Sequence, residues 1–371
     1  MTAVFTEEQT ALRHMVRDFC DTHFPESAVR QTMESGAGFD PELWTRMAQE
    51  MGLTGIAVAE EFGGSGAGQV ELNIVVEELG RALAVSPFFS TVVLASNLLS
   101  ALSDAELNQS LLPGIVDGST TATVAFIEPA GRFDEDLSTA GSESGGQWTL
   151  QGTKVNVLDG GTADHLLVSA RTDRGTSIFE VKAGAAGMAV EQQDTLDLTR
   201  PQAQITFDGT PARLVGEEGR GAEPLSSTLR LASVSLSSEN AGGALRLIEL
   251  SADYARTREQ FGKVIGGYQA IKQKIADVLL QVELARAAAH QVARAADHDP
   301  DVLPLESAMA HALTSEAYVQ AAYETIQIHG GIGFTWEHPA HLYFRRAKSN
   351  EVLFGTPSHH RELAARQLLG Q

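Results

Sequence analysis

The sequence predicts an architecture in which a helical segment, an all-β segment and a second helical segment follow one another. Three observations predict it: helical periodicity over 1–118, short runs of β-branched and aromatic residues over 119–222, and long helical patterns over 223–371. At 371 residues the chain exceeds what one compact core usually supports. We therefore predict three domains with these boundaries.

Helix-capping patterns justify the helices of the first segment. Thr6 with Gln9, and Ser103 with Glu106, match the capping box, and Asp40-Pro41 places a cap before proline at the first helical position. The glycine-rich run 63–68 interrupts this pattern. It follows a helix rather than a strand and fits neither the dinucleotide fingerprint nor the P-loop, so we interpret it as a turn.

The middle segment contains six short runs that are typical of strands, separated by Gly, Asp and Ser. They lie at 121–127, 148–150, 154–158, 165–168, 177–181 and 203–207. Strands do not alternate with helices here, which excludes a Rossmann fold and predicts an all-β module.

The last segment carries apolar residues at three- and four-residue spacing over 225–255 and 271–292. A third helix is expected around 309–317 and a fourth over 357–369. Long helices with short connections predict a four-helix bundle.

Composition excludes several classes of function. The chain has 27 Lys plus Arg against 48 Asp plus Glu, a net charge of −21, which would repel a nucleic-acid backbone. The single cysteine, Cys20, allows no internal disulfide and no cysteine-built metal site, and its amphipathic context predicts a buried, inert thiol. No run of about 20 apolar residues and no signal-peptide pattern is present, so we expect a soluble, cytoplasmic protein without a membrane partner.

Two segments carry a resemblance to a known family. Tyr254–Ile265 reads YARTREQFGKVI, and Gln327–Thr335 reads QIHGGIGFT and continues to Arg345-Arg346 and Gly355-Thr356. Together they resemble the C-terminal signatures of the acyl-CoA dehydrogenase family. Glu61–Gly64 and Phe126–Pro129 extend the resemblance over the whole chain. It implies an N-terminal helical domain, a central β-barrel domain and a C-terminal four-helix bundle. It also implies FAD-dependent α,β-dehydrogenation of an acyl-CoA thioester in fatty-acid or steroid side-chain β-oxidation.

The resemblance also implies where FAD is held. In this family FAD lies between the β domain and the bundle of one subunit, and a neighbouring subunit reaches its pyrophosphate and adenosine. The positions that reach across are matched here by Arg258, Gln260, Phe261, Gln327, Gly330 and Gly331. Arginine offers a fork of donors to a pyrophosphate, and glycines let backbone N–H groups approach it. The alternative interpretation is a solvated arginine at a helix end and a glycine that stops a helix.

The chain departs from the family at the positions that face the flavin ring. Asn156 replaces the usual Trp, and Leu158 replaces the Thr that bonds the edge of the ring. Ile127 replaces a Thr, and the run 130–134, AGRFD, replaces Gly-Ala-Gly-Ser-Asp after Glu128-Pro129. The resemblance therefore implies that the flavin-facing half of the FAD site is altered in this chain, whereas the half that contacts a neighbouring subunit's FAD is intact.

The catalytic base is missing from both of its usual positions in the family. These positions are occupied by Phe354 and Ala232, and neither residue accepts a proton. Glu239 is a nearby candidate, two helical turns or about 10 Å beyond Ala232. It is either a displaced general base, or a helix contact or subunit salt bridge.

Other titratable clusters give weaker signals. His338 and His341 have metal-like spacing, but Pro339 interrupts a helix that would align them, so we predict no metal. We expect His359 and His360 to be solvated at a helix start. Arg345, Arg346 and Lys348 form a local basic run that would face CoA phosphates, a partner chain or solvent, and Arg346 replaces the family's usual Asp.

Three functional hypotheses follow. The favoured one is a non-catalytic subunit of a hetero-oligomer, a heterotetramer, that completes the FAD site of a partner acyl-CoA dehydrogenase chain. The alternative is a self-sufficient homo-oligomeric acyl-CoA dehydrogenase that uses Glu239 as base. The third is a flavoprotein of the same fold with other chemistry, such as a nitroalkane oxidase or a flavin monooxygenase relative. For either dehydrogenase we expect an electron-transfer flavoprotein as electron acceptor.

Overall fold

The computed structural model describes residues 5–130 and 137–370. The chain folds into two compact units that each combine separate stretches of sequence. Unit 1 consists of Met1–Gln31, Gly68–Ala84 and Ala232–Gln371, and unit 2 of Thr32–Ala67 and Val85–Leu231. Both units draw on more than one of the three predicted segments, so the domain boundaries at 118 and 222 stay predictions.

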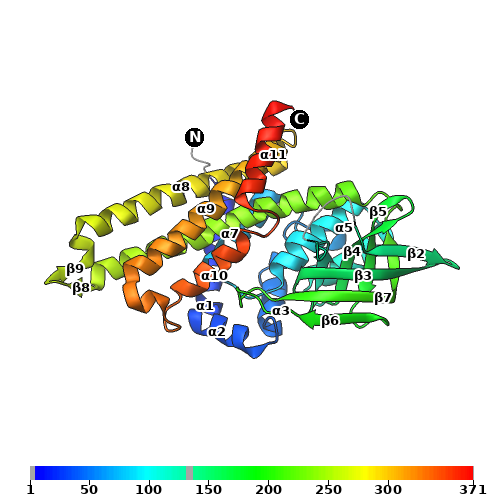
Figure 1. Cartoon of the computed structure of the whole chain (residues 1–371), viewed down its shortest axis with the longest axis horizontal. Coiled ribbons are helices and arrows are strands. Elements are labelled where there is room, and N and C mark those ends of the chain that lie inside the picture. The colour runs from blue at the N-terminus through cyan, green and yellow to red at the C-terminus, as the bar shows by residue number, and fades with distance from the viewer. Residues whose placement is uncertain (1–4, 131–136, 371) are drawn as a thin grey trace. The chain divides into compact units, whose positions relative to one another are not determined.

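Unit 1 is helical. Helices α8 and α9 run side by side, α10 and α11 pack on α9, and α1 packs on α4 (Figure 1). The elements are α1 (Glu7–His23), α2 (Glu26–Ser35, whose last turn counts with unit 2), α4 (Gln69–Arg81), α7 (Ala222–Thr257, mostly in unit 1), β8 (Glu259–Gln260), β9 (Lys263–Val264), η4 (Ile265–Gly267), α8 (Gln269–His298), α9 (Leu303–His329), η5 (Gly330–Phe334), α10 (Ala340–Asn350) and α11 (Pro357–Leu369). The bundle expected from the sequence is confirmed, and α10 is an additional helix.

A close crossing of α4 and α7 fixes the centre of unit 1. A Cβ added to Gly242 would lie 1.9 Å from the backbone oxygen of Glu77, so only glycine permits this approach. The Glu77 side chain accepts hydrogen bonds from Arg13 at 2.8 Å and His290 at 2.7 Å. Burial opposes its ionisation, but His290, Arg13 and Arg286 lower the pKa of Glu77 to about 2. This carboxylate therefore ties α1 and α8 to α4.

Unit 2 contains a β-barrel with short helices beside it. The helical elements are α3 (Pro41–Gln49), η1 (Leu53–Gly55), η2 (Glu60–Phe62), the π-helical η3 (Phe89–Ser96), α5 (Asn97–Leu102) and α6 (Ala105–Val116). The strands are β1 (Ala122–Ala125), β2 (Ala140–Ser144), β3 (Gln147–Leu158), β4 (His165–Thr172), β5 (Gly175–Lys182), β6 (Met188–Gln192) and β7 (Gln202–Val215).

Pairing closes the sheet of unit 2 into a ring. The strand order is β4-β2-β3-β7-β5, and β5 pairs again with β4, which confirms the expected β-barrel. Outside the ring, β1 pairs in parallel with β4 and β6 pairs with β7. Leu150, Val168, Phe179 and Phe207 are fully buried in the barrel core. A Cβ on Gly141 would lie 2.7 Å from the Phe179 ring, so glycine makes room for it.

Two of the three capping predictions are confirmed. Thr6 and Gln9 form the reciprocal capping box of α1, at 3.0 and 3.2 Å. Asp40 caps α3 ahead of Pro41. The prediction at Ser103 is wrong: Asp104 caps α6 by accepting the Leu107 N–H at 3.0 Å, because Ser103 takes a left-handed conformation that ends α5.

The glycine-rich run 63–68 is a turn, as its context predicts. The N–H groups of Ser65, Gly66 and Ala67 donate, each at 2.9 Å, to backbone oxygens of the segment 55–58. These donors therefore serve the fold and do not form a phosphate cradle.

Two statements from composition can be compared with the structure. Cys20 is buried, and burial raises the pKa of its thiol, as expected for an inert cysteine. Among the residues described, no helix is both long and apolar enough to cross a bilayer.

Candidate functional site

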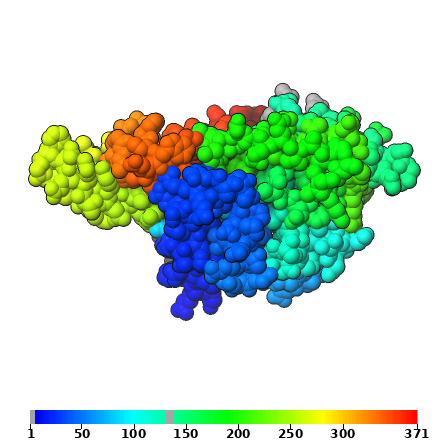
Figure 2. Space-filling view, turned by 90° about the horizontal axis from the view of Figure 1, so that it is seen from below, coloured from blue at the N-terminus to red at the C-terminus, as the bar shows by residue number. Residues whose placement is uncertain are grey.

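One end of unit 1 brings the two predicted cofactor-contact segments together. Ala255, Ile265 and Ile328 form a small buried cluster that holds the β8–β9 hairpin against the end of α9. Tyr268 fixes the hairpin further, because its hydroxyl donates to the backbone oxygen of Gln260 at 2.9 Å. Figure 2 shows the yellow surface of the hairpin region next to the orange surface that follows α9. We call this region the hairpin face.

The hairpin face presents its polar and aromatic side chains to solvent. All six residues that the resemblance assigns to cofactor contact are exposed: Arg258, Gln260, Phe261, Gln327, Gly330 and Gly331. Phe261 is 93% exposed at the tip of the hairpin, with a left-handed φ of 51°. A large apolar side chain held exposed in a strained conformation is typical of a functional contact.

The glycines of the hairpin face border open space. A Cβ added to Gly262, Gly330 or Gly331 would meet no atom within 4 Å. Backbone N–H groups at such positions are accessible to a phosphate, and Arg258 provides guanidinium donors beside them. These residues fit the pyrophosphate end of a dinucleotide cofactor.

The positions that the resemblance assigns to the flavin ring lie in unit 2. Asn156 lies at an irregularity in the pairing of β3 with β7, with a left-handed φ of 53°, and its N–H donates to Gln193 Oε1 at 2.8 Å. Leu158 is buried, 3% exposed, and has no hydroxyl to offer. Residues 131–134 of the altered run lie outside the described residues.

A buried ion pair anchors this part of unit 2. Lys154 Nζ donates to Glu128 Oε1 at 2.9 Å, and Ser138 and Thr139 also donate to the Glu128 carboxylate. Burial lowers the pKa of Lys154 to about 8. Burial also opposes ionisation of Glu128, but the bonds from Lys154 and Ser138 lower its pKa to about 2. The Lys154 amine and the Glu128 carboxylate therefore link β3 to the segments at 128 and 138–139 of unit 2.

Both family positions for the base are buried and apolar in unit 1. Ala232 is fully buried and Phe354 is 8% exposed. The turn at Phe354 has a left-handed φ of 61°, and its backbone oxygen accepts the Nε2–H of His360 at 3.1 Å. No proton acceptor is supplied by either side chain.

Glu239 lies in a buried polar cluster between α7 and α10. Its Oε1 accepts from Arg346 Nη1 at 2.9 Å and from Asn350 Nδ2 at 3.0 Å, and Asn350 also donates to Asn240 Oδ1 at 2.8 Å. Glu239 is 4% and Arg346 3% exposed. Arg346, which replaces the family's usual Asp, therefore forms an ion pair with Glu239. The geometry supports the helix-contact interpretation of Glu239.

The basic run at 345–348 is not a shared surface patch. Arg346 is buried against Glu239, Lys348 pairs with Glu351, and Arg345 lies over the Trp336 ring at 5.1 Å. The three cations therefore do not share one surface, because successive helical residues point in different directions.

A histidine pair missed by the sequence interpretation holds the turn at 354–355. His311 and His360 stack with centroids 3.8 Å apart, and His311 Nε2 donates to the Gly355 oxygen at 3.1 Å. The other nitrogen of His311 then accepts from the Ser233 hydroxyl at 2.9 Å. The expectation that His360 is solvated is wrong, since it is only 6% exposed, whereas His359 is exposed. His338 and His341 join no group of three or more metal-binding side chains in the described parts of the chain.

Comparison with known proteins identifies the family. The model of the acyl-CoA dehydrogenase N-terminal domain matches residues 6–119, and that of the C-terminal domain matches 219–369. The chain is 32% identical to the acyl-CoA dehydrogenase IpdE2 of Mycobacterium tuberculosis over 351 residues, 95% of this chain and 94% of that protein. The chain belongs to the acyl-CoA dehydrogenase family. Members of this family are FAD-dependent oxidoreductases, and the fold described above is theirs.

Two solved relatives are heteromeric by name. The ChsE4-ChsE5 complex from Mycobacterium tuberculosis superposes with a TM-score of 0.91 at 30% identity, covering 100% of both chains. A variant of the steroid acyl-CoA dehydrogenase Tcur3481-Tcur3483 superposes with a TM-score of 0.87 at 31% identity, covering 98% of both chains.

Proposed function

We propose that this chain is a non-catalytic subunit of a heteromeric acyl-CoA dehydrogenase and completes the FAD site of a partner chain. One observation carries the proposal: the hairpin face is exposed and open where a cofactor would be contacted, while the chain's own flavin-facing and base positions hold Leu158, Asn156 and Phe354. Random loss of function would alter both halves of the FAD site, but in this chain only the flavin-facing half is altered. The heteromeric relatives support the same assignment.

In this proposal the chain helps to bind and orient the FAD of its partner. Arg258 would donate to the cofactor pyrophosphate, Gln260 and Gln327 would offer amide groups, and Phe261 would shield the cofactor from water. When bound, FAD would accept a hydride from the β carbon of an acyl-CoA thioester, and a carboxylate of the partner would remove the α proton. An electron-transfer flavoprotein would then reoxidise the cofactor. The name of one solved relative, a steroid acyl-CoA dehydrogenase, favours a steroid-derived acyl-CoA thioester as substrate.

A self-sufficient homo-oligomer with Glu239 as base is the second candidate. The buried ion pair disfavours it, because a general base must reach the substrate proton, and the same Glu239 oxygen already accepts two hydrogen bonds.

The flavin content of purified protein tests the proposal. We expect the chain expressed alone to carry little FAD, because Asn156 has no aromatic ring to stack on a flavin and Leu158 has no hydroxyl to bond its edge. Co-expression with the product of the adjacent gene, as a first choice of partner, should give a complex with flavin absorbance. A yellow homo-oligomer with one FAD per chain would instead establish the self-sufficient enzyme.

Replacement of Arg258 tests the cross-subunit contact. We expect Arg258→Ala to weaken FAD binding in the flavin-containing assembly by about 2–3 kcal/mol, roughly 30- to 150-fold, through loss of a charge-assisted bond to phosphate. The measurement is flavin affinity by fluorescence titration of apoprotein. Arg256→Ala is the matched control, since Arg256 is also exposed but pairs with Asp253. Equal affinities for the two variants would refute the assignment of Arg258.

Replacement of Glu239 separates the two candidate functions. We expect Glu239→Gln to leave flavin reduction by substrate close to wild type in complexes matched for flavin content. Loss of a true general base lowers the rate roughly 10²- to 10⁴-fold. Anaerobic bleaching of the flavin after rapid mixing measures this rate, and a loss beyond about a hundredfold would make Glu239 catalytic.

A further inference from the structure

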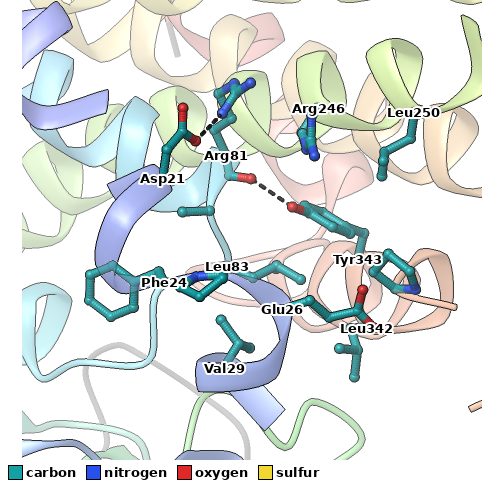
Figure 3. A pocket seen from close by; sticks show the side chains of 13 residues that line it. Asp21, Phe24, Glu26, Val29, Arg81, Leu83, Arg246, Leu250, Leu342 and Tyr343 are labelled. Atoms are coloured by element: carbon teal, nitrogen blue, oxygen red, sulfur yellow. Dashed lines mark hydrogen bonds and ion pairs between the residues drawn. The ribbon is translucent and has the colours of Figure 1, made fainter. Parts of the chain in front are cut away.

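Unit 1 contains a cavity that the proposed function does not use. Its volume is about 480 Å³, within the usual range for small-molecule sites. Figure 3 shows the side chains that line it. They come from the end of α1 and the turn after it, from α2, from the end of α4, from α7 and from α10. All of the lining residues belong to unit 1, and none of them is part of the hairpin face.

One side of the cavity is apolar. Phe24, Val29, Leu83 and Leu342 are buried beneath it, and Leu250 adds a partly buried side chain. Leu83 has a left-handed φ of 50°, because the chain turns sharply at the end of α4. This arrangement offers a hydrocarbon surface to a ligand that enters from solvent.

The carboxylates at the rim already have cationic partners. Asp21 accepts from Arg81 Nη1 at 3.2 Å, and Glu26 pairs with Arg30 at 2.7 Å. Arg81 also donates to Glu249 at 2.8 Å. Together with Arg246, which pairs with Glu249, three arginines therefore match the three carboxylates Asp21, Glu26 and Glu249.

The hydroxyl of Tyr343 and the guanidinium of Arg246 form the remaining polar side. Tyr343 donates its proton to the Arg81 backbone oxygen at 2.7 Å. Burial raises the pKa of this phenol to about 12, so it stays neutral. Arg246 extends from α7 toward Tyr343 (Figure 3), and within residues 5–130 and 137–370 its ion pair is with Glu249, at 3.3 Å. Arg246 is partly exposed, and Glu249 is shared with Arg81, so the five N–H donors of this guanidinium are only partly used.

We propose that this cavity binds a short apolar carboxylate, with the carboxylate on Arg246 and the hydrocarbon chain against Leu83, Val29 and Leu342. Guanidinium binds carboxylate in a fixed, often bidentate geometry, which sets the class of head group. The apolar lining sets the class of tail, and the volume of about 480 Å³ leaves room for a short alkyl chain. The site is separate from the FAD contacts, so its test does not depend on the proposed function.

The test uses the full chain, in the assembly in which it purifies, titrated with hexanoate by calorimetry or ligand-observed NMR. We expect hexanoate to bind more tightly than 1-hexanol and hexylammonium. Arg246→Gln should weaken hexanoate binding at least tenfold while leaving 1-hexanol unchanged. Arg256→Gln, an exposed arginine of the same helix, is the matched control.

A second variant keeps the test independent of the charge change. Leu342→Trp fills the apolar side and should abolish binding of hexanoate, with the thermal unfolding midpoint showing that the protein stays folded. The proposal is overturned if hexanoate fails to bind, if Arg246→Gln binds it as tightly as wild type, or if hexylammonium is preferred.

Discussion

Arg346→Met is expected to destabilise the protein by about 3–5 kcal/mol, because it removes the guanidinium that pairs with the buried Glu239 carboxylate. Glu239 is 4% exposed and Arg346 3%, so water cannot replace the lost partner. Asn350 would still donate to the carboxylate, but a neutral amide does not compensate its charge.

Chemical denaturation with the unfolding midpoint and slope measures this loss. The double variant Arg346→Met with Glu239→Gln should recover most of the stability, since it removes both charges together and keeps an amide toward Asn350. Lys348→Met is the matched control on the same helix, because Lys348 is 37% exposed and makes only a surface pair. A loss below about 1 kcal/mol for Arg346→Met, the range of exposed pairs, would show that the pair is not the buried contact described here.

The periodicity of the sequence predicts the long elements and misses the short polar ones. Helices α7, α8 and α9 carry enough apolar repeats to be recognised, and the barrel strands with β-branched residues are found. Strands β2 and β6 are missed because AGSES and MAVEQ are poor in such residues, and their pairing with β3 and β7 defines them. Tertiary hydrogen bonding, not local preference, makes these segments strands.

In the candidate site, too, local motifs are visible in the sequence, whereas contacts between distant residues are not. The hairpin-face residues lie in two compact motifs, so their pattern is visible in the sequence and the structure adds only their proximity. The partner of Glu239 lies 107 residues away, and no local pattern joins the two. His311 stands in a run of alanines, where nothing signals that it stacks on His360 or bonds the turn at Gly355. Contacts between distant helices become apparent only in the folded chain.

The stacked histidine pair predicts a stability that falls as the pH drops below about 6.5. Burial and the nearby His360 lower the pKa of His311 to about 3, and burial lowers that of His360 to about 4. Above the unfolded pKa of about 6.5 both states are neutral and the pair adds no pH dependence. Below pH 6.5 the two histidines bind protons in the unfolded chain but stay neutral in the folded chain. The free energy of unfolding therefore falls as the pH falls toward the folded pKa values.

His360→Gln measures how much of the pH-dependent loss of stability comes from the His360 imidazole. Glutamine retains an N–H donor for the Phe354 oxygen and does not titrate. We expect the wild type to lose roughly 2–3 kcal/mol more than this variant between pH 7 and pH 4.5, from the pKa shift at about 1.4 kcal/mol per unit. The acids Glu77 and Glu128 have pKa values of about 2, so their stabilising charges are lost mostly below this window. His359→Gln, at the exposed neighbouring position, is the control and should keep the wild-type slope. If His360→Gln and wild type lose stability in parallel over this pH range, the buried pair does not stay neutral in the folded protein.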